Sequence, residues 1–477
     1  MSNLTNSSAG RRIAALLDEN SFVEIGAKVT ARSTDFNLET KKAPGDGVMT
    51  GYGLIDGNLV YVYSQDASVL GGAVGEMHAK KIVNLYHMAV KTGAPVIGLI
   101  DSAGMRLEEA TDAMYAFGRI YHNQALASGV VPQITAVFGN CGGGLALIPG
   151  ITDFTFMEGS KAKLFVNSPN AIKGNYEEKK DTASAAFQSE EAGNVDFVGS
   201  EDEIFAGIRE LVTFLPANNE EEALTECTDD LNRASDVIAS CAGDTAAALA
   251  EIADDNRFLE VKSTYGKNMA VGFIRLNGAT IGCVANRTEI TGEDGKPAET
   301  LKSTLCVNGV KKAADFVRFC DAFEIPVLTL TNVTGYCTCE FAEKNIAREA
   351  AKLTAAFAEA TVPKVNVYVK EAFGTAAIVM NSKSIGADYA YAWENAKIGS
   401  MDAKHAAEIM YDGEDKSVID EKAKEYEALQ TSAASAASRG YVDTIIAPED
   451  TRKYVIGAFE MLYTKREDRP DKKHGAV

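Results

Sequence analysis

The sequence repeats itself at a constant spacing, and this repeat limits the fold more than any other feature. The segment 80–104 reads KKIVNLYHMAVKTGAPVIGLIDSAG, and the segment 311–335 reads KKAADFVRFCDAFEIPVLTLTNVTG. The lysine pair, the proline, the apolar run and the glycine recur in step, at an offset of 311 − 80 = 231 residues. Gly143 and Gly374 share the same offset. The repeat predicts two similar domains joined head to tail.

The boundary between the two domains is expected in an acidic, weakly apolar stretch at 216–230. We therefore predict domains 1–228 and 229–477. Short apolar runs predict buried strands at 96–100 and 327–330. Runs rich in β-branched residues predict further strands at 133–138 and 364–369. Ala-rich or amphipathic stretches between these strands predict helices at 110–128 and 340–360. Alternating strands and helices indicate an α/β fold.

Composition excludes some classes of function. A net charge of −20 argues against a nucleic-acid partner, because such partners select basic surfaces. The eight cysteines are scattered, without the C-x-x-C spacing of a zinc site, and the N-terminus lacks the apolar stretch of a signal peptide. No run approaches the roughly 18 apolar residues of a membrane helix. We expect a protein of the reducing cytoplasm.

The sharpest local feature is a glycine cluster at 139–149, GNCGGGLALIP, between a predicted strand and an apolar run. Glycine lets a ligand approach the main chain closely, and the first N–H groups of a helix lack partners inside the helix. Such a turn suits an anionic oxygen, including the enolate of a thioester. A tight turn packed against a neighbouring helix is the alternative interpretation. The repeat places a second turn, EAFGTAAIVM, at 371–380.

Motifs spread over both halves match one known family. In the first half they are GDGVMTGYG from Gly45, YVYSQD from Tyr61, GEMHAKKI from Gly75, GAPVIGLIDSAG from Gly93, SGVVPQI from Ser128 and TDFTFM from Thr152. In the second half they are FCDAFEIPVL from Phe319, FAEATVPKV from Phe357, YAWENAKIGSM from Tyr391, RGYVDTIIAP from Arg439 and the KREDRPDKKHG ending. From about 45 to 474, the chain resembles the carboxyltransferase components of biotin-dependent enzymes acting on acyl-CoA.

The resemblance implies two tandem crotonase-like (ClpP/crotonase) domains, superhelices of β-β-α units related by internal duplication. The first half would hold acyl-CoA and the second half biotin, with the active site shared between subunits of a dimer or a hexamer. Biotin would arrive on a biotin carboxyl carrier protein, and the other partners would be a biotin carboxylase or membrane decarboxylase subunits. In such enzymes carboxybiotin releases CO2, its ureido nitrogen takes the α-proton, and the thioester enolate attacks the CO2.

The resemblance also assigns residues. Backbone donors at Gly143 and Gly144 would hold the thioester oxygen, and those at Gly374 and Thr375 the biotin ureido oxygen. Further contacts are expected from Gly142, Ala103 and Gly104 to acyl-CoA, and from Ala376, Gly335 and Ile378 to biotin. No metal is expected, and Cys337-x-Cys339 is a weak metal signal. The histidines, which form no recognisable triad and are expected to be solvated or in the core, are His78, His87, His122, His405 and His474.

The chain departs from the family pattern in its second half. Thr375 stands where a second glycine is usual, and the segment 332–339, NVTGYCTC, replaces a proline- and glycine-rich stretch. These changes keep a non-catalytic scaffold subunit open as an alternative. A crotonase-like hydratase or thioester hydrolase is another, and it would need a positioned carboxylate as general base. Asp101 and Arg106, beyond a predicted strand end, fit either a structural ion pair or a ligand contact.

Overall fold

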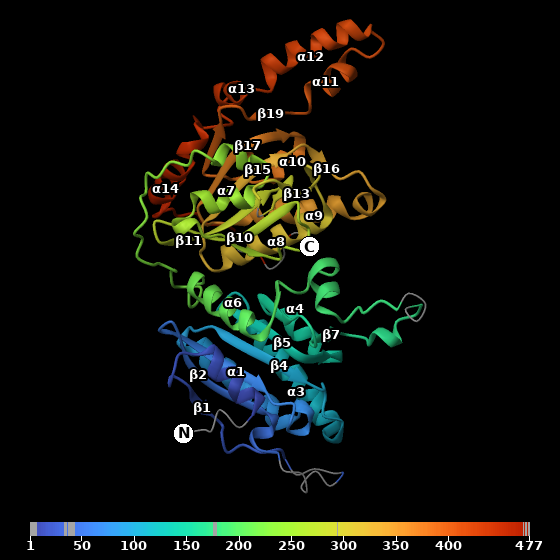
Figure 1. The fold of residues 1–477 in the computed structure, drawn as a ribbon, viewed down its shortest axis with the longest axis vertical. Helices are drawn as coiled ribbons and strands as arrows, with labels where there is room; N and C mark the ends of the chain where they lie inside the picture. The colour runs from blue at the N-terminus through green and yellow to red at the C-terminus, as the bar shows by residue number, and fades with distance from the viewer. Residues whose placement is uncertain are drawn as a thin grey trace. The chain divides into compact units, whose positions relative to one another are not determined.

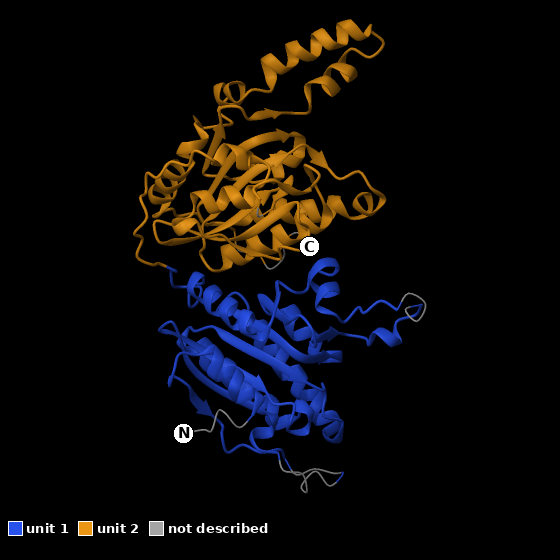
Figure 2. Ribbon diagram, in the orientation of Figure 1, with its two compact units in different colours: residues 1–223 blue, residues 224–477 orange. Residues whose placement is uncertain are grey.

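The computed structural model of the chain describes residues 7–32, 36, 43–174, 179–292, 294–470, 472 and 475. The chain forms two compact units, residues 1–223 and residues 224–477 (Figure 2). The division falls inside the acidic stretch 216–230, five residues before the predicted boundary (228 − 223 = 5). Each unit has a buried apolar core of its own, with Ile82 in the first and Leu328 in the second. His474 lies outside the described residues.

Unit 1 contains one eight-stranded sheet with helices packed against it (Figure 1). Its strands are β1 (Val23–Ile25), β2 (Val48–Ile55), β3 (Asn58–Gln65), β4 (Val96–Ser102), β5 (Gln133–Gly142), β6 (Phe154–Glu158), β7 (Lys163–Phe165) and β8 (Phe197–Gly199). The order is β1-β2-β3-β4-β5-β6-β8, and β7 pairs with β5 beyond the end of β6. The β1–β2 and β2–β3 pairs are antiparallel, and the remaining pairs are parallel.

The main helices of unit 1 are α1 (Ser8–Leu16), α2 (Glu76–Thr92), α3 (Ala110–Ala127), α4 (Leu147–Ile151) and α6 (Glu201–Phe214). Their ends follow ordinary capping chemistry. Helix α2 ends at Gly93, which adopts φ +64° as a left-handed cap. Helix α6 begins with a reciprocal capping box between Ser200 and Glu203. Helices α2 and α3 pack on each other, as do α1 and α6.

Unit 2 repeats this plan. The strands of its main sheet are β9 (Leu259–Val261), β10 (Met269–Leu276), β11 (Ala279–Asn286), β15 (Val327–Val333), β17 (Lys364–Phe373), β18 (Tyr389–Trp393), β19 (Lys397–Gly399) and β20 (Thr444–Ile446). The order is β9-β10-β11-β15-β17-β18-β20, and β19 pairs with β17. Two small ladders add β12 (Glu289–Thr291) with β13 (Pro297–Thr300), and β14 (Thr304–Leu305) with β16 (Gly335–Tyr336). The β9–β10 and β10–β11 pairs are antiparallel, and the strands that follow are parallel.

The register of the two sheets follows the sequence offset. Val96 of β4 lies between Tyr61 and Gln133, whereas Val327 of β15 lies between Gly282 and Lys364. The equivalent residues of β4 and β15 are 327 − 96 = 231 positions apart, and those of β5 and β17 are 364 − 133 = 231 apart. The equivalent residues of β3 and β11 are 282 − 61 = 221 positions apart. The predicted α/β class is confirmed, as are the strands and helices expected at the paired segments.

The helices of unit 2 are α7 (Thr245–Ile252), α8 (Val307–Ala322), α9 (Glu340–Glu359), α10 (Gly374–Val379), α11 (Ala403–Met410), α12 (Lys416–Gln430), α13 (Ala433–Ser438) and α14 (Thr451–Leu462). Helices α11 and α12 form a hairpin that projects from the sheet of this unit (Figure 1). No residue of α12 is buried. Among the residues that the structure describes, no helix is long and apolar enough to cross a membrane.

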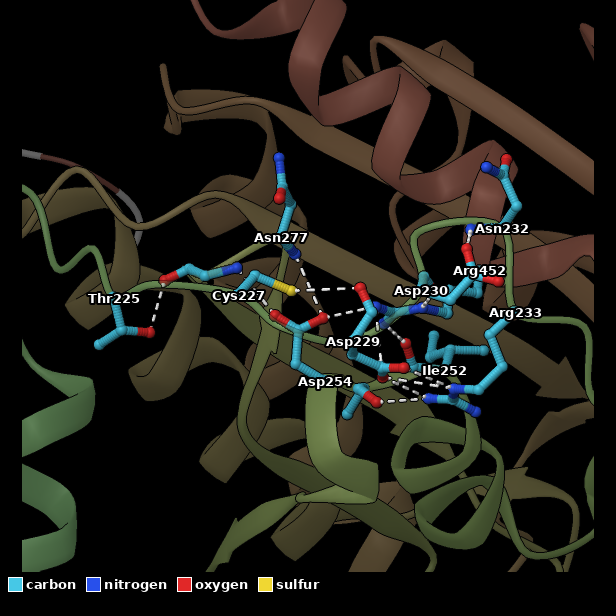
Figure 3. A network of polar contacts seen from close by, with 12 residues as sticks. Thr225, Cys227, Asp229, Asp230, Asn232, Arg233, Ile252, Asp254, Asn277 and Arg452 are labelled. Carbon is cyan, nitrogen blue, oxygen red and sulfur yellow. Dashed lines mark hydrogen bonds and ion pairs between the residues drawn. The ribbon is translucent and has the colours of Figure 1, made fainter.

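The chain enters unit 2 through a network of ion pairs (Figure 3). The guanidinium of Arg452, which is 2% exposed, lies 2.7 Å from Asp254 and 3.4 Å from Asp229. Asp229 also pairs with Arg233 at 3.0 Å, and these arginines hold its pKa below the usual range, chiefly through the Arg233 hydrogen bond. The network fixes Asp229 to Arg452 of α14. Asn218 donates to the Gly93 carbonyl of unit 1 at 2.9 Å, so the linker lies between Asn218 and Asp229.

Candidate active site

The glycine turn of unit 1 follows directly from β5. That strand ends at Gly142, a short 3-10 helix covers Gly143–Ala146, and α4 follows. Gly143 has φ +62°, a left-handed conformation that disfavours residues with a Cβ. A Cβ at this position would meet no atom within 4 Å, so Gly143 faces open space. The N–H groups of Gly143 and Gly144 open a helix and have no partner within it.

The flanking glycines are needed for packing instead. A Cβ on Gly142 would lie 2.6 Å from the ring of Phe165. A Cβ on Gly144 would lie 2.9 Å from the hydroxyl of Tyr121, which donates a hydrogen bond to the Gly144 carbonyl. Both interpretations of the glycine cluster therefore apply, at different positions: Gly142 and Gly144 allow close packing, and Gly143 leaves the main chain open.

The loop of Ala103 and Gly104 lies beside this turn. It follows β4, which is the neighbour of β5 in the sheet. A Cβ on Gly104 would come within 3.5 Å of the Gly142 carbonyl oxygen. The structure thus brings together the residues that the sequence assigned to the acyl side.

Backbone groups of this loop already have partners. The N–H of Ala103 donates to the carbonyl of Gly71 at 2.8 Å, and the N–H of Gly104 donates to Ser102 Oγ at 3.1 Å. The carbonyl of Gly104 accepts from the N–H of Val74 at 2.8 Å. The N–H groups of Ala103 and Gly104 are therefore already used in contacts within the protein.

A buried ion cluster lies next to the loop of Ala103 and Gly104. The guanidinium of Arg106 lies 2.6 Å from Asp46 and 2.8 Å from Glu109, and all three side chains are at most 1% exposed. Burial raises the pKa of Asp46, although the charge of Arg106 opposes this. His78 bonds through its ring to the Asp46 carbonyl and to Gln65, and burial lowers its pKa to about 3. His78 is thus a neutral core histidine, and Arg106 is a structural cation.

Asp101 is also occupied. Its carboxylate lies 2.9 Å from the guanidinium of Arg12, which is itself 7% exposed. Gly139 leaves room for this carboxylate, since a Cβ there would overlap Asp101 Oδ1 at 2.0 Å. The structural ion pair is therefore the correct alternative for Asp101 as well.

The second glycine turn opens on a cavity of about 890 Å³ in unit 2. The five residues that the sequence assigned to biotin all line it, and they are Gly335, Gly374, Thr375, Ala376 and Ile378. The turn forms where β17 ends and α10 begins. Strand β16 supplies Gly335. Residues far apart in the sequence thus meet at one cavity.

Gly374 repeats the geometry of Gly143. Its φ is +64°, and a Cβ there would lie 3.2 Å from the carbonyl oxygen of Ser400. Ala376 is 1% exposed and packs into the unit, whereas Ile378 is 41% exposed and offers an apolar surface. The N–H of Thr375 lies in the first turn of α10, so a side chain at this position leaves the backbone donor in place.

Several polar residues of this cavity were not predicted from the sequence. The lining includes Tyr336, Tyr368, Ser400, Tyr426 and Arg439. The hydroxyls of Ser400 and Tyr426 lie 2.6 Å apart, and burial raises the pKa of Tyr368 to about 12. These residues come from β16, β17, the segment after β19, α12 and the end of α13. No local pattern joins them, so only the fold reveals that they share a site.

Asn332, part of the altered segment, supports the sheet rather than the cavity. Its side-chain amide donates to the Ala242 carbonyl at 3.0 Å, and its side-chain oxygen accepts from the N–H of Glu371 at 3.5 Å. Its own N–H donates to the side-chain oxygen of Asn286. The asparagine thus holds the end of β15 against β17 and β11, close to the second turn.

A cavity of about 780 Å³ in unit 1 lies along α2 and α3. Charged side chains such as Arg32, Lys80, Glu76 and Asp112 line it, and none of the residues predicted for the acyl side does. Within the described part of the chain, no group of three or more His, Cys, Asp or Glu side chains is placed to hold a metal ion.

Comparison with known proteins identifies the family. The carboxyl transferase domain family matches residues 6–477. The propionyl-CoA carboxylase beta chain of Roseobacter denitrificans is 40% identical over 484 residues, covering 98% of this chain and 93% of its own length. The methylmalonyl-CoA decarboxylase subunit alpha of Veillonella parvula is 38% identical over 483 residues, covering 98% and 92%.

A solved structure agrees with these relatives. Transcarboxylase 12S, determined as a hexamer with hydrolysed methylmalonyl-coenzyme A bound, superposes with a TM-score of 0.89. It is 35% identical, and the match covers 98% of this chain and 92% of that one. The chain belongs to the carboxyl transferase family, and its resemblance to the carboxyltransferases of biotin-dependent acyl-CoA enzymes is confirmed.

Proposed function

We propose that this protein transfers a carboxyl group between biotin and an acyl-CoA, with one ligand held at each glycine turn. One observation carries the proposal. Gly143 and Gly374 occupy equivalent positions at the ends of corresponding strands, with φ values of +62° and +64°. Two similar turns would give one enzyme two places where an oxygen can meet backbone N–H donors, and the reaction has two carbonyl-bearing substrates.

On the acyl side, the N–H groups of Gly143 and Gly144 would bind the thioester oxygen. As the α-proton leaves, negative charge gathers on that oxygen, and fixed donors stabilise the enolate more than the neutral thioester. The open space at Gly143 lets the thioester reach the main chain. Tyr121 fixes the turn by donating to the Gly144 carbonyl. The loop of Ala103 and Gly104 would form the wall along the acyl group.

On the biotin side, the cavity of unit 2 would hold the bicyclic urea and thioether ring of biotin. Its wall combines the backbone turn at Gly374 and Thr375 with apolar surface from Ile378 and hydroxyls from Ser400 and Tyr426. Biotin, when bound there, would supply a ureido nitrogen that can carry the carboxyl group. The chain's own task would be to bind and orient, because the reactive atoms belong to cofactor and substrate.

The hydratase and hydrolase alternatives need an available carboxylate near the acyl turn. Among the described residues, Asp46, Asp101 and Glu109 are acidic side chains at or next to the loop of Ala103 and Gly104. Each is paired with an arginine, Asp46 and Glu109 with Arg106 and Asp101 with Arg12. Carboxylates held in this way are poor general bases, so the geometry favours carboxyl transfer.

The proposal includes the architecture and the partners. The shared strand order and register support two crotonase-like domains that arose by duplication. Biotin would be carried by a separate carrier protein, and a biotin carboxylase or a membrane decarboxylase subunit would complete the complex. We propose a cytoplasmic homo-oligomer, a dimer or a hexamer, with acyl and biotin turns from different subunits forming one site. The hexamer assembly of transcarboxylase 12S supports this.

Carboxyl exchange tests the proposal directly. The purified chain is incubated with methylmalonyl-CoA or malonyl-CoA and free biotin or a biotinylated carrier, without ATP or added metal, and loss of the acyl carboxyl group is followed. We expect biotin-dependent turnover from an oligomer seen by light scattering. A folded oligomer that turns over no acyl-CoA of a panel would support the scaffold alternative. A stable, active monomer would contradict the shared site.

A further inference from the structure

Two cysteines lie in contact beside the cavity of unit 2. The sulfurs of Cys337 and Cys339 are 3.8 Å apart, and Cys339 is exposed whereas Cys337 is partly exposed. Thr338 alone separates them in sequence. A disulfide needs the sulfurs at about 2.05 Å, so this loop must rearrange before the bond can form. The proposed transfer of a carboxyl group uses neither thiol.

The two thiols differ in their surroundings. Cys339 is the N-cap of α9, and its sulfur accepts a hydrogen bond from the N–H of Ala342 at 3.4 Å. This bond comes first among the causes that lower the pKa of Cys339, and Lys302 adds a smaller favourable charge. Burial raises the pKa of Cys337. Such asymmetry provides one attacking thiolate and one thiol that reacts second, as thiol–disulfide exchange requires.

The exposed face of the pair opens on a separate cavity of about 360 Å³. Cys306 lines it together with Cys337 and Cys339. Lys302 adds positive charge to the wall and lowers the pKa of Cys339, whereas Lys267 is paired with Glu299 at 2.8 Å. The charge of Lys302 on this face favours a reagent that carries carboxylates. Cys306 has other contacts, since its thiol lies 2.7 Å from the side-chain oxygen of Asn268.

We propose that Cys337 and Cys339 form a thiol–disulfide switch that reacts with an anionic low-molecular-weight disulfide. The Cys339 thiolate attacks one sulfur of the reagent, forming a mixed disulfide and releasing one thiolate. Cys337 then loses its proton to solvent and attacks the Cys339 sulfur, which releases the second thiolate. The chain loses two electrons and two protons, and the reagent is reduced to two thiols. An excess of a dithiol reverses both steps.

The switch would act on the neighbouring cavity, and this part rests on the proposed function. Gly335 and Tyr336 form β16, line the cavity at the second turn, and immediately precede Cys337. Strand β16 is short and pairs only with β14, while the N–H of Cys337 donates to Leu305 at 2.9 Å. Closing a ring of three residues would turn Thr338 and remove the Cys339 N-cap. We therefore expect oxidation to displace Tyr336 and weaken biotin binding.

Oxidised glutathione is the probe for the first experiment. The oligomer is incubated with it at pH 7, then alkylated, digested and examined by peptide mass spectrometry. We expect a Cys337–Cys339 bond, seen as the loss of two hydrogen atoms from one peptide, and its disappearance after dithiothreitol. Cys339→Ser should abolish the bond. Cys337→Ser should stop at the mixed disulfide on Cys339.

Alkylation kinetics provide the matched control. Cys241 is a partly exposed cysteine of the same unit whose pKa is raised by burial. We expect Cys339 to react with iodoacetamide at least about tenfold faster than Cys241 at pH 7, because the thiolate is the reactive form. Equal rates, or glutathione on Cys241 before Cys339, would overturn the assignment. A Cys306–Cys339 bond in place of the expected one would also overturn it.

The functional consequence is measured separately. Oxidised protein should lose at least about tenfold in carboxyl exchange with biotin and recover on reduction, whereas oxidised Cys337→Ser/Cys339→Ser protein should not change. Acyl-CoA binding by calorimetry should stay the same, since unit 1 contains neither thiol. A disulfide without any loss would refute the coupling to the cavity. A reduced protein without exchange activity would instead refute the proposed function, and the mass measurement would still decide the switch.

Discussion

The substitution Gly143→Ala should distinguish the contribution of this glycine to stability from its contribution to activity. Alanine at φ +62° is strained, and a left-handed residue with a Cβ costs about 1–2 kcal/mol. Nothing lies within 4 Å of the added Cβ, so no clash increases this cost. Gly57 offers a matched control in the same unit, because it has φ +81° and an equally open Cβ position at the β2–β3 turn.

Both variants should therefore unfold alike and react differently. We expect Gly143→Ala and Gly57→Ala each to lose about 1–2 kcal/mol in free energy of unfolding, measured by urea titration. Only Gly143→Ala places its methyl group where the thioester must reach the backbone donors. The N–H groups remain, but the methyl group keeps the thioester oxygen away from them. Loss of one oxyanion hydrogen bond costs about 10²–10³ in rate, so the kcat/KM for acyl-CoA should fall by about that factor. Gly57→Ala should retain activity.

The second turn supplies the reciprocal experiment. Gly374→Ala should weaken biotin binding and leave acyl-CoA binding nearly unchanged, with Gly413→Ala, at φ +91° and with an open Cβ position, as its control. Contact with the Ser400 carbonyl at 3.2 Å should make Gly374→Ala slightly less stable than its control. Equal loss of acyl-CoA affinity in Gly143→Ala and Gly374→Ala would refute the assignment of one ligand to each turn.

Three further substitutions test the supporting structure. Arg106→Met leaves two buried carboxylates uncompensated and should lower the free energy of unfolding by about 3–5 kcal/mol in denaturant titration. Lys312 has its pKa lowered by burial from 10.5 to about 7. The unfolded chain thus binds more protons between pH 7 and 10.5, and Lys312 contributes more stability as the pH rises. The free energy of unfolding of the wild type should therefore rise relative to that of Lys312→Met by up to about 1.4 kcal/mol per pH unit. Thermal melts of both proteins at pH 7–9 measure this difference. Tyr121→Phe should lower kcat by about tenfold, with little change in Tm, because the Gly144 carbonyl loses its donor.

The sequence predicted where the strands begin better than where they end. Strand β4 was expected over 96–100 and continues to Ser102, and β5 was expected over 133–138 and continues to Gly142. Polar and glycine residues mark these last positions, and such residues are rare inside strands. Pairing with β7, at Asn140 with Lys163, keeps β5 extended through its glycines. Tertiary contacts therefore decide the ends of the strands that carry the site.

The candidate site was predictable to the extent that it lies in the repeat. Gly143 and Gly374 were found because the same turn occurs twice, and their positive φ values give the physical reason for glycine. Tyr426 and Arg439 were missed, because they lie on α12 and at the end of α13, which no sequence motif linked to the second turn. The outcome for Asp101 required coordinates, since its partner Arg12 is 89 residues away in sequence.

Comparison of equivalent positions explains what the two units keep in common. Lys81 and Lys312 are 231 residues apart, and each donates from its buried Nζ to two main-chain carbonyls, Gly45 and Val48 in one unit and Lys262 and Tyr265 in the other. These lysines tie α2 and α8 to the chain that leads into each hairpin.

The first residues of β5 and β17 also bind a helix to the sheet, but with different side chains. Gln133 donates to the carbonyl of Gln124 near the end of α3, and Lys364 donates to two carbonyls at the end of α9. The position that faces the turn has diverged instead: Tyr121 holds Gly144, whereas the residue 231 positions later is Lys352, which pairs with Glu349. Positions that hold helices to the sheet keep their contacts, and the position beside the turn does not. Two ligands of different shape would select for this pattern, because each turn needs the same backbone but a different wall.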